Sequence, residues 1–115
     1  MEYLNKIEIR GQVGSVRRKE HNGRTVASIS VATTRVYRNS GGDPVMDTTW
    51  HIVNAWEGRG IDDLSALEKG MKVYVLGRVT NRTYVVNDGT DRTVTEIQAQ
   101  QLNIIDDPSP FSYEA

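Results

Sequence analysis

Cysteine is absent from this chain of 115 residues. Disulfides, thiolate catalysis and Cys-ligated zinc or iron–sulfur sites are therefore excluded. Histidine is nearly as scarce, since only His21 and His51 are present. One falls in an expected turn and the other in an expected strand, without the spacing of metal ligands. We therefore predict neither a metal site nor a cofactor.

Long apolar runs are missing as well. No stretch approaches the roughly 20 residues that a helix needs to cross a bilayer. The N-terminal residues lack the basic and apolar regions of a signal peptide. We expect a soluble, intracellular protein with no membrane partner, and its length suits one domain with a proper core.

An excess of positive charge is also missing, because the formal net charge is −1. The acidic residues Asp106, Asp107 and Glu114 lie in the last ten positions, which hold no Lys or Arg. Residues 1–105 then carry 14 basic and 12 acidic side chains, a balance of +2. This mild balance neither supports nor excludes a nucleic-acid partner. The uneven distribution of charge separates a predicted domain, residues 1–105, from a short acidic tail, residues 106–115.

Alternating apolar residues predict an all-β chain. The expected strands are residues 4–16, bent at Gly11 and Gly14, then 24–37, 46–56, 71–86 and 93–105. Residues 61–69 are expected to form one short α-helix, with Asp62 as its N-cap and Gly70 after its end. Five strands with a helix between the third and fourth indicate a five-stranded Greek-key barrel of the OB-fold class. An SH3-like barrel would not place a capped helix there.

Four aromatic residues are the most informative feature that is present. Trp50 and Trp56 lie six residues apart in one expected strand, so they share one face, opposite the small apolar residues of that strand. With those residues in the core, both indoles point to solvent. Tyr37 and Tyr84 stand at the ends of neighbouring strands and extend the set. Such rings can stack on unpaired bases, with roughly 1–3 kcal/mol for each base.

Cationic side chains accompany these rings. The candidates for phosphate contacts are Arg17, Arg18, Lys19, Arg35, Arg38, Arg78 and Arg82. Together, rings and cations predict sequence-independent binding of a single-stranded nucleic acid, with no code for base edges. Two simpler interpretations stay open. The cluster at residues 17–19 can be a solvated hairpin tip, and the tyrosines can merely cover a barrel rim. His51 faces away from the rings, which favours a core or subunit-interface role.

The order of several short segments resembles the bacterial single-stranded DNA-binding protein (SSB) family over about residues 4–105. These segments are Asn5-Lys6-Ile7, Thr49-Trp50-His51, Leu67-Glu68-Lys69-Gly70, Val73-Tyr74-Val75-Leu76-Gly77 and Thr95-Glu96-Ile97. The resemblance places the family's four DNA-stacking aromatics on Tyr37, Trp50, Trp56 and Tyr84. It also implies a homotetramer that acts in DNA replication, recombination and repair, in the cytoplasm with the nucleoid.

The chain departs from the family pattern at three places. The basic residue that usually follows Trp-His is Ile52, and the usual Gly-Lys after the third aromatic is Glu57-Gly58. The family also ends in an acidic peptide that recruits replication and repair enzymes. The segment Asp106–Phe111 is similar but directly follows the expected barrel. The similarity of this segment to the family's acidic peptide implies replication and repair proteins as partners of the tail.

Two other classes of function compete with DNA binding. Ile52, Glu57 and the near-neutral charge motivate an OB-fold protein-interaction module with weak DNA affinity, such as a replication-restart or mobile-element paralogue. An enzyme is disfavoured, because the acidic residues are dispersed over turns and the expected helix and form no cluster for a catalytic metal. A chromosomal, plasmid or phage role, and a preference for DNA or RNA, stay open.

Overall fold

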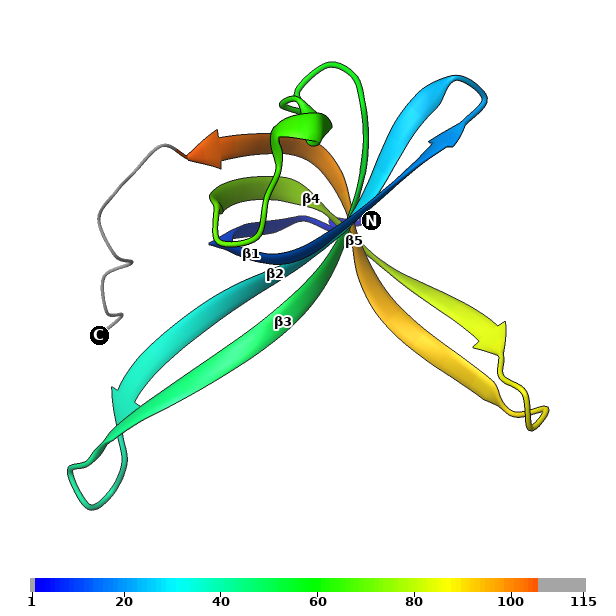
Figure 1. The fold of residues 1–115 in the computed structure, drawn as a ribbon. Coiled ribbons are helices and arrows are strands. Elements are labelled where there is room, and N and C mark those ends of the chain that lie inside the picture. The colour runs from blue at the N-terminus through cyan, green and yellow to red at the C-terminus, as the bar shows by residue number, and fades with distance from the viewer. Residues whose placement is uncertain (1, 106–115) are drawn as a thin grey trace.

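Alternating side chains build five long strands in the computed structural model, which describes residues 2–105 (Figure 1). The strands are β1 (Ile7–His21), β2 (Arg24–Arg38), β3 (Pro44–Trp56), β4 (Lys72–Val85) and β5 (Asp91–Ile105). They close into a barrel in the order β1-β2-β3-β5-β4. Antiparallel pairing joins all neighbours except β3 and β5, which run parallel where Val53 faces Ile97. The predicted five-stranded OB-fold barrel is thus confirmed.

The inward face of each strand forms the core. Ala27, Ile29 and Val31 on β2 are fully buried, as are Val53 and Ala55 on β3. The other buried apolar residues come from the remaining strands and the β3–β4 connection: Val13, Leu64, Leu67, Val73, Val75, Ile97 and Leu102. Each buried Val, Leu or Ile side chain stabilises the fold by roughly 1.5–3 kcal/mol. Burial of this set on β3 turns the alternate positions of that strand, including both tryptophans, towards solvent.

Three hairpins project from the barrel (Figure 1). The β1–β2 hairpin turns at Asn22 and Gly23, both with positive φ (53° and 79°), as a two-residue hairpin turn requires. The β2–β3 arm, residues 33–49, begins where β2 loses its partner β1. The β4–β5 arm, residues 80–96, lies beyond the points where β4 loses its partner β1 and β5 loses its partner β3. Both arms expose two sheet faces, so side chains on either face can meet a ligand.

The expected α-helix at residues 61–69 is wrong, because this segment contains only the 3₁₀ turn η1 (Leu64–Ala66). The main chain before it is engaged with β5 instead. Asp62 donates its N–H to the carbonyl of Leu102 (2.9 Å), and its carboxylate accepts from the N–H of Ile104 (2.8 Å). Asp63, not Asp62, caps the turn. Tertiary hydrogen bonds therefore replace the bonds that a helix would have made. In residues 2–105, no helical segment is long and apolar enough to cross a membrane.

Strand β1 also differs from its predicted bounds, since it starts at Ile7 and continues to His21. Its two glycines lie where the expectation placed a bend. A Cβ on Gly11 would stand 2.4 Å from the carbonyl oxygen of Ala32, so β1 and β2 approach too closely there for any side chain. Gly14 lies at a register shift between Val13 and Ser15. The bulge bends β1 so that it can pair with β4 at one end and with β2 at the other.

Candidate nucleic-acid interface

One row of polar side chains crosses the outer face of all five strands. Arg17 on β1 stands opposite Ser28 on β2, which stands opposite Asn54 on β3. Asn54 is the partner of Gln98 on β5, and Gln98 is the partner of Arg78 on β4. Directly opposed residues in neighbouring strands point to the same side of a sheet. These residues therefore run across one continuous surface, with an arginine at each end. We call the set the polar row: Arg17, Ser28, Asn54, Gln98 and Arg78.

Three of the four predicted rings share the face of the polar row. Trp50 and Trp56 lie four and two residues from Asn54 on β3, and Tyr84 lies six residues from Arg78 on β4. Even spacing along an unbroken strand keeps them on that side. The exposed fractions are 60% for Trp50, 38% for Trp56 and 41% for Tyr84. The rings are thus presented to solvent on both sides of the row.

Trp50 lies against the bulge in β1. A Cβ on Gly14 would stand 2.4 Å from Cζ3 and 2.7 Å from Cη2 of this indole. The ring can occupy this place only because residue 14 has no side chain. Gly14 therefore positions Trp50, and nothing in the sequence pattern of β3 pointed to that contact.

Trp56 is flanked by the β1–β2 hairpin. The Arg24 guanidinium carbon lies 5.4 Å from the ring centroid, and the His21 ring meets the indole edge-on at 5.8 Å. Arg24 also donates to the carbonyl of Glu57 (2.8 Å), whose carboxylate accepts from the N–H of Thr25 (2.7 Å). Glu57 thus fastens the end of β3 to β2. Sequence reasoning missed Arg24 and His21, which become visible only when the register of β2 and β3 is known.

Tyr37 lies apart from the other three rings. It has the strand parity of Val31, so it stands on the reverse face of the β2–β3 arm from Trp50, whose cross-strand partner is Ala32. The side chain is 41% exposed. Arg35 stacks over it at 4.7 Å and pairs with Asp47 at 3.8 Å on the same face. The four rings therefore do not form one row on a single face.

The predicted cations fall into two groups. Four of them already have partners. Arg18 donates to the carbonyls of Leu64 (2.7 Å) and Leu67 and so holds η1. Arg38 donates to the carbonyl of Gly42 (2.7 Å) in its own loop. The other two partnered cations are Arg35, paired with Asp47, and Arg82, paired with Glu96.

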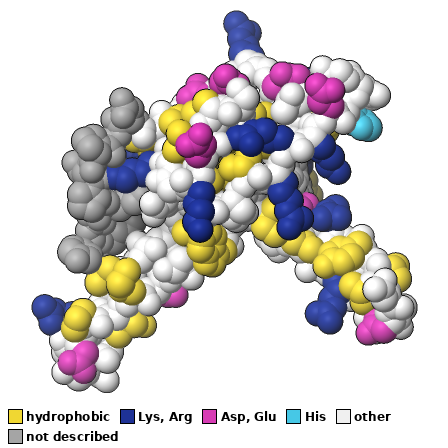
Figure 2. Space-filling model, in the orientation of Figure 1, with side chains coloured by type: hydrophobic (Ala, Val, Ile, Leu, Met, Phe, Trp, Pro, Cys, Tyr) yellow, Lys and Arg dark blue, Asp and Glu magenta, His cyan; other side chains and the backbone are white. Residues whose placement is uncertain are grey.

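Three cations are exposed and make no hydrogen bond or ion pair with any other residue in the range 2–105: Arg17, Lys19 and Arg78. These three remain the candidates for phosphate contacts. Figure 2 shows Lys and Arg side chains gathered over the barrel and at the bases of the two lower arms.

Glu96 is a buried carboxylate on the outer face of β5. Arg82 reaches it with Nε at 3.2 Å and Nη2 at 3.4 Å, and this contact raises the pKa of Arg82 above its ordinary value. The guanidinium carbon also lies 5.6 Å from the ring of Tyr84. Arg82 therefore neutralises Glu96 and supports Tyr84, so a phosphate chain can pass this carboxylate without meeting an unpaired negative charge.

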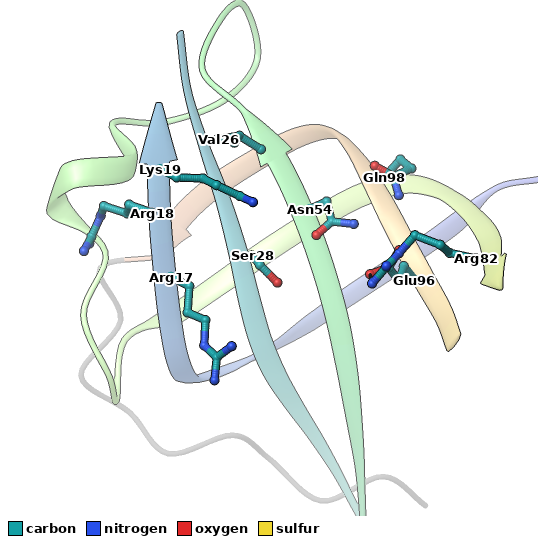
Figure 3. Close-up of a pocket in the computed structure, with 9 residues that line it drawn as sticks. All are labelled: Arg17, Arg18, Lys19, Val26, Ser28, Asn54, Arg82, Glu96 and Gln98. Atoms are coloured by element: carbon teal, nitrogen blue, oxygen red, sulfur yellow. Dashed lines mark hydrogen bonds and ion pairs between the residues drawn. The ribbon is translucent and has the colours of Figure 1, made fainter. Parts of the chain in front are cut away.

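Two adjoining depressions lie along the polar row. The larger, about 640 Å³, is lined by Arg17, Arg18, Lys19, Val26, Ser28, Asn54, Arg82, Glu96 and Gln98 (Figure 3). In that view Arg18 points away from the other side chains, in keeping with its bonds to η1. The smaller, about 310 Å³, adds Trp56 and His21 to Lys19, Val26, Asn54 and Gln98. The two share a floor of amide groups, which sequence reasoning missed.

His51 stands away from this face. Its Nε2 lies 2.9 Å from the hydroxyl of Thr33, and burial lowers the pKa of the imidazole below its ordinary value of 6.5. Within the described range, no three His, Asp or Glu side chains lie together in a way that could hold a metal ion. The tail segment Asp106–Phe111, predicted to recruit partners, lies outside the described residues.

Comparisons with known proteins agree with this geometry. The model of the Single-strand binding protein family matches residues 4–105. The chain is 31% identical over 106 residues to the single-stranded DNA-binding protein of Neisseria meningitidis serogroup B, with 89% of this chain and 60% of the relative covered. It is 32% identical over 106 residues to single-stranded DNA-binding protein 1 of Chlorobaculum tepidum, with 89% and 65% covered. The chain thus spans 60–65% of the length of these curated relatives.

Among solved structures, the Plasmodium falciparum SSB in complex with ssDNA superimposes with a TM-score of 0.80 at 30% identity, over 92% of this chain and 98% of that one.

Proposed function

Because the chain belongs to the single-strand binding protein family, we propose that it binds single-stranded DNA, by base stacking and phosphate contacts and without reading a sequence. The family consists of DNA-binding, non-enzymatic proteins. One observation carries the proposal. Trp50, Trp56 and Tyr84 present their rings to solvent on the same face as the unpaired cations Arg17 and Arg78.

Stacking supplies the selectivity for single strands. Each exposed ring can cover the face of one unpaired base, which contributes roughly 1–3 kcal/mol whatever the base. Duplex DNA buries its base faces against each other and cannot offer them without strand separation. Three rings on one face therefore favour an unpaired strand, and Tyr37 extends the surface around the β2–β3 arm.

Electrostatics supply a path for the backbone. Arg17 and Arg78 end the polar row, and Lys19 lies two residues from Arg17 on the same face of β1. None of the three is neutralised by a described residue. Two acidic groups beside these residues are already engaged, because Glu96 pairs with Arg82 and Glu57 accepts from the β2 main chain. A phosphate chain can therefore follow the row, and binding releases counterions, so affinity falls as salt rises.

The assembly and cellular role are also part of the proposal. We propose a homotetramer that acts in DNA replication, recombination and repair in the cytoplasm. Family membership supports this part, and one barrel face with three rings offers a small footprint that several copies would enlarge. Light scattering measures the mass; a monomer with full DNA affinity would refute the tetramer and leave DNA binding intact.

Tryptophan emission tests the DNA-binding proposal directly. Oligo-dT should quench the emission of Trp50 and Trp56 at low salt, and a duplex at the same nucleotide concentration should not compete. Trp56→Ala should weaken binding by about 1–3 kcal/mol, because one stacking surface is lost.

The matched control is Tyr3→Ala, which removes an aromatic ring that is 91% exposed and lies outside the polar row. The control should bind oligo-dT as the parent does. Unquenched emission of the parent protein with oligo-dT would overturn the proposal. Equal binding by the parent, Trp56→Ala and Tyr3→Ala would refute stacking on Trp56. A complex with a protein partner that survives salt, without DNA binding, would favour the interaction module instead.

A further inference from the structure

The floor beside Trp56 contains a hydrogen-bond chain that runs from Gln98 through Thr80 to the main chain of Glu96. The hydroxyl of Thr80 donates to the main-chain carbonyl of Glu96 at 3.4 Å. A hydroxyl has a single proton, so Thr80 can only accept from its other neighbour. That neighbour is Gln98, whose Nε2 donates to the Thr80 hydroxyl oxygen at 3.1 Å. This chain favours the orientation in which the Gln98 amide nitrogen faces Thr80, because only then are both contacts made.

With its nitrogen held by Thr80, Gln98 keeps its carbonyl oxygen as an acceptor without a described partner. Gln98 lines both depressions along the polar row, and no other residue in the range 2–105 bonds its oxygen. Asn54 stands directly beside it on β3, and its amide makes no hydrogen bond within that range either. Both side chains border the shared depression in Figure 3.

A stacking ring adjoins these amides. Trp56 lies two residues from Asn54 on the same face of β3, and the smaller depression is lined by Trp56, Asn54 and Gln98 together. Lys19 lines it too, so a cation borders the same space. A base stacked on Trp56 can therefore turn its polar edge towards the Gln98 oxygen, while its phosphate can meet Lys19. Unpaired bases are commonly bound by stacking and edge hydrogen bonds together.

We propose that this depression is a base-edge subsite, in which the carbonyl oxygen of Gln98 favours bases that carry an exocyclic amino group. This preference acts at one position and tunes affinity without specifying a sequence. The inference rests on the proposed binding of single-stranded DNA. Cytosine and adenine each offer an amino group that can donate to this oxygen. Uracil and thymine place a carbonyl oxygen there, and their only ring N–H lies one position further along the edge, between two carbonyl oxygens. The sequence alone predicted no such preference.

Oligo-dC and oligo-dU of about 16 nucleotides, a length within the range bound by OB folds, form the matched pair of probes. Their bases differ at position 4, which bears an amino group in cytosine and an oxygen in uracil, and in the proton at N3. The quantity measured is the ratio of the two affinities, obtained by tryptophan quenching. Gln98→Met removes the acceptor at similar length. It should weaken oligo-dC by about 2- to 10-fold, the usual worth of one hydrogen bond, and leave oligo-dU nearly unchanged.

Thr80→Val keeps the shape of the side chain and provides a second variant that leaves Gln98 itself unchanged. This change frees the Gln98 amide to turn over, so the affinity of oligo-dC relative to oligo-dU should fall, as in Gln98→Met. Gln101→Met is the control, since Gln101 lies on the same strand outside both depressions. It should preserve the parental ratio.

The outcomes separate the two proposals. Binding of neither oligonucleotide would refute the proposed function and the subsite with it. Binding of both, with the parental ratio retained in Gln98→Met and in Thr80→Val, would refute the subsite and leave the function standing. An affinity difference between oligo-dC and oligo-dU that persists unchanged in both variants comes from stacking and would count against the subsite.

Discussion

Gly14→Ala tests the physical basis of the interface most sharply, because the change lies on β1 and the affected ring lies on β3. The added Cβ would stand 2.4 Å from Cζ3 and 2.7 Å from Cη2 of Trp50. Carbon atoms in contact lie about 3.5–4.0 Å apart, so the end of the indole must move by roughly 1 Å or more. The main chain at Gly14 does not need positive φ. The reduced freedom of the unfolded chain should therefore offset part of the cost of moving the indole, and the protein should stay folded.

The expected result is weaker DNA binding without unfolding. Complete loss of one stacking surface costs roughly 1–3 kcal/mol, which is about 5- to 150-fold in affinity. A displaced ring should lose part of this amount. The measurement is a tryptophan quenching titration with oligo-dT at fixed salt, alongside urea denaturation. Gly41→Ala is the control, since its Cβ would make only an ordinary contact of 3.5 Å with Asn39 in the β2–β3 loop.

A double-mutant cycle supplies the refutation. If Gly14 acts only through Trp50, then Gly14→Ala should have no further effect on affinity in a Trp50→Ala background. An equal loss in both backgrounds would show that the bulge affects binding by another route. Parental affinity in the single variant would show that Trp50 need not occupy the place over Gly14.

Two further predictions concern residues that the structure separates by role. Arg17→Gln should lower the slope of log affinity against log salt by about 0.7, the value for one phosphate contact with a single strand. Arg18→Gln should keep the slope but lower the free energy of unfolding by about 1–3 kcal/mol, because η1 loses its charged donor. A changed slope in Arg18→Gln, with an unchanged slope in Arg17→Gln, would contradict these roles. For His51, burial lowers the folded-state pKa, so the unfolded chain binds the proton more readily. The contribution of neutral His51 to the free energy of unfolding is fully present above pH 6.5 and is lost as the pH falls towards the folded pKa. Urea denaturation at about pH 7.5 and about pH 5.5 should therefore show a smaller loss of unfolding free energy on acidification in His51→Gln than in the parent. An equal loss in both proteins would refute this.

Much of the fold could be predicted because strand alternation is a local property. The burial of Val53 and Ala55 follows from the period of two, and so does the exposure of Trp50 and Trp56. The Asn22-Gly23 turn also follows, because few residues other than Asn and Gly accept positive φ. The α-helix failed for the opposite reason, since its first residues found hydrogen-bond partners on β5, some 40 positions later in the chain.

The sequence by itself determined which side chains point outward from each strand, and with them the three rings and the exposed cations of the interface. Only the tertiary structure decided which of these groups meet. Closure of the barrel through the parallel pair of β3 and β5 brings Asn54 to Gln98. The end of β1 carries Arg18 to η1 instead of to a phosphate, and unbroken pairing of β2 with β3 turns Tyr37 to the reverse face. Period and turn chemistry act within a few residues, whereas these contacts depend on strand register, which is set by packing across the whole barrel.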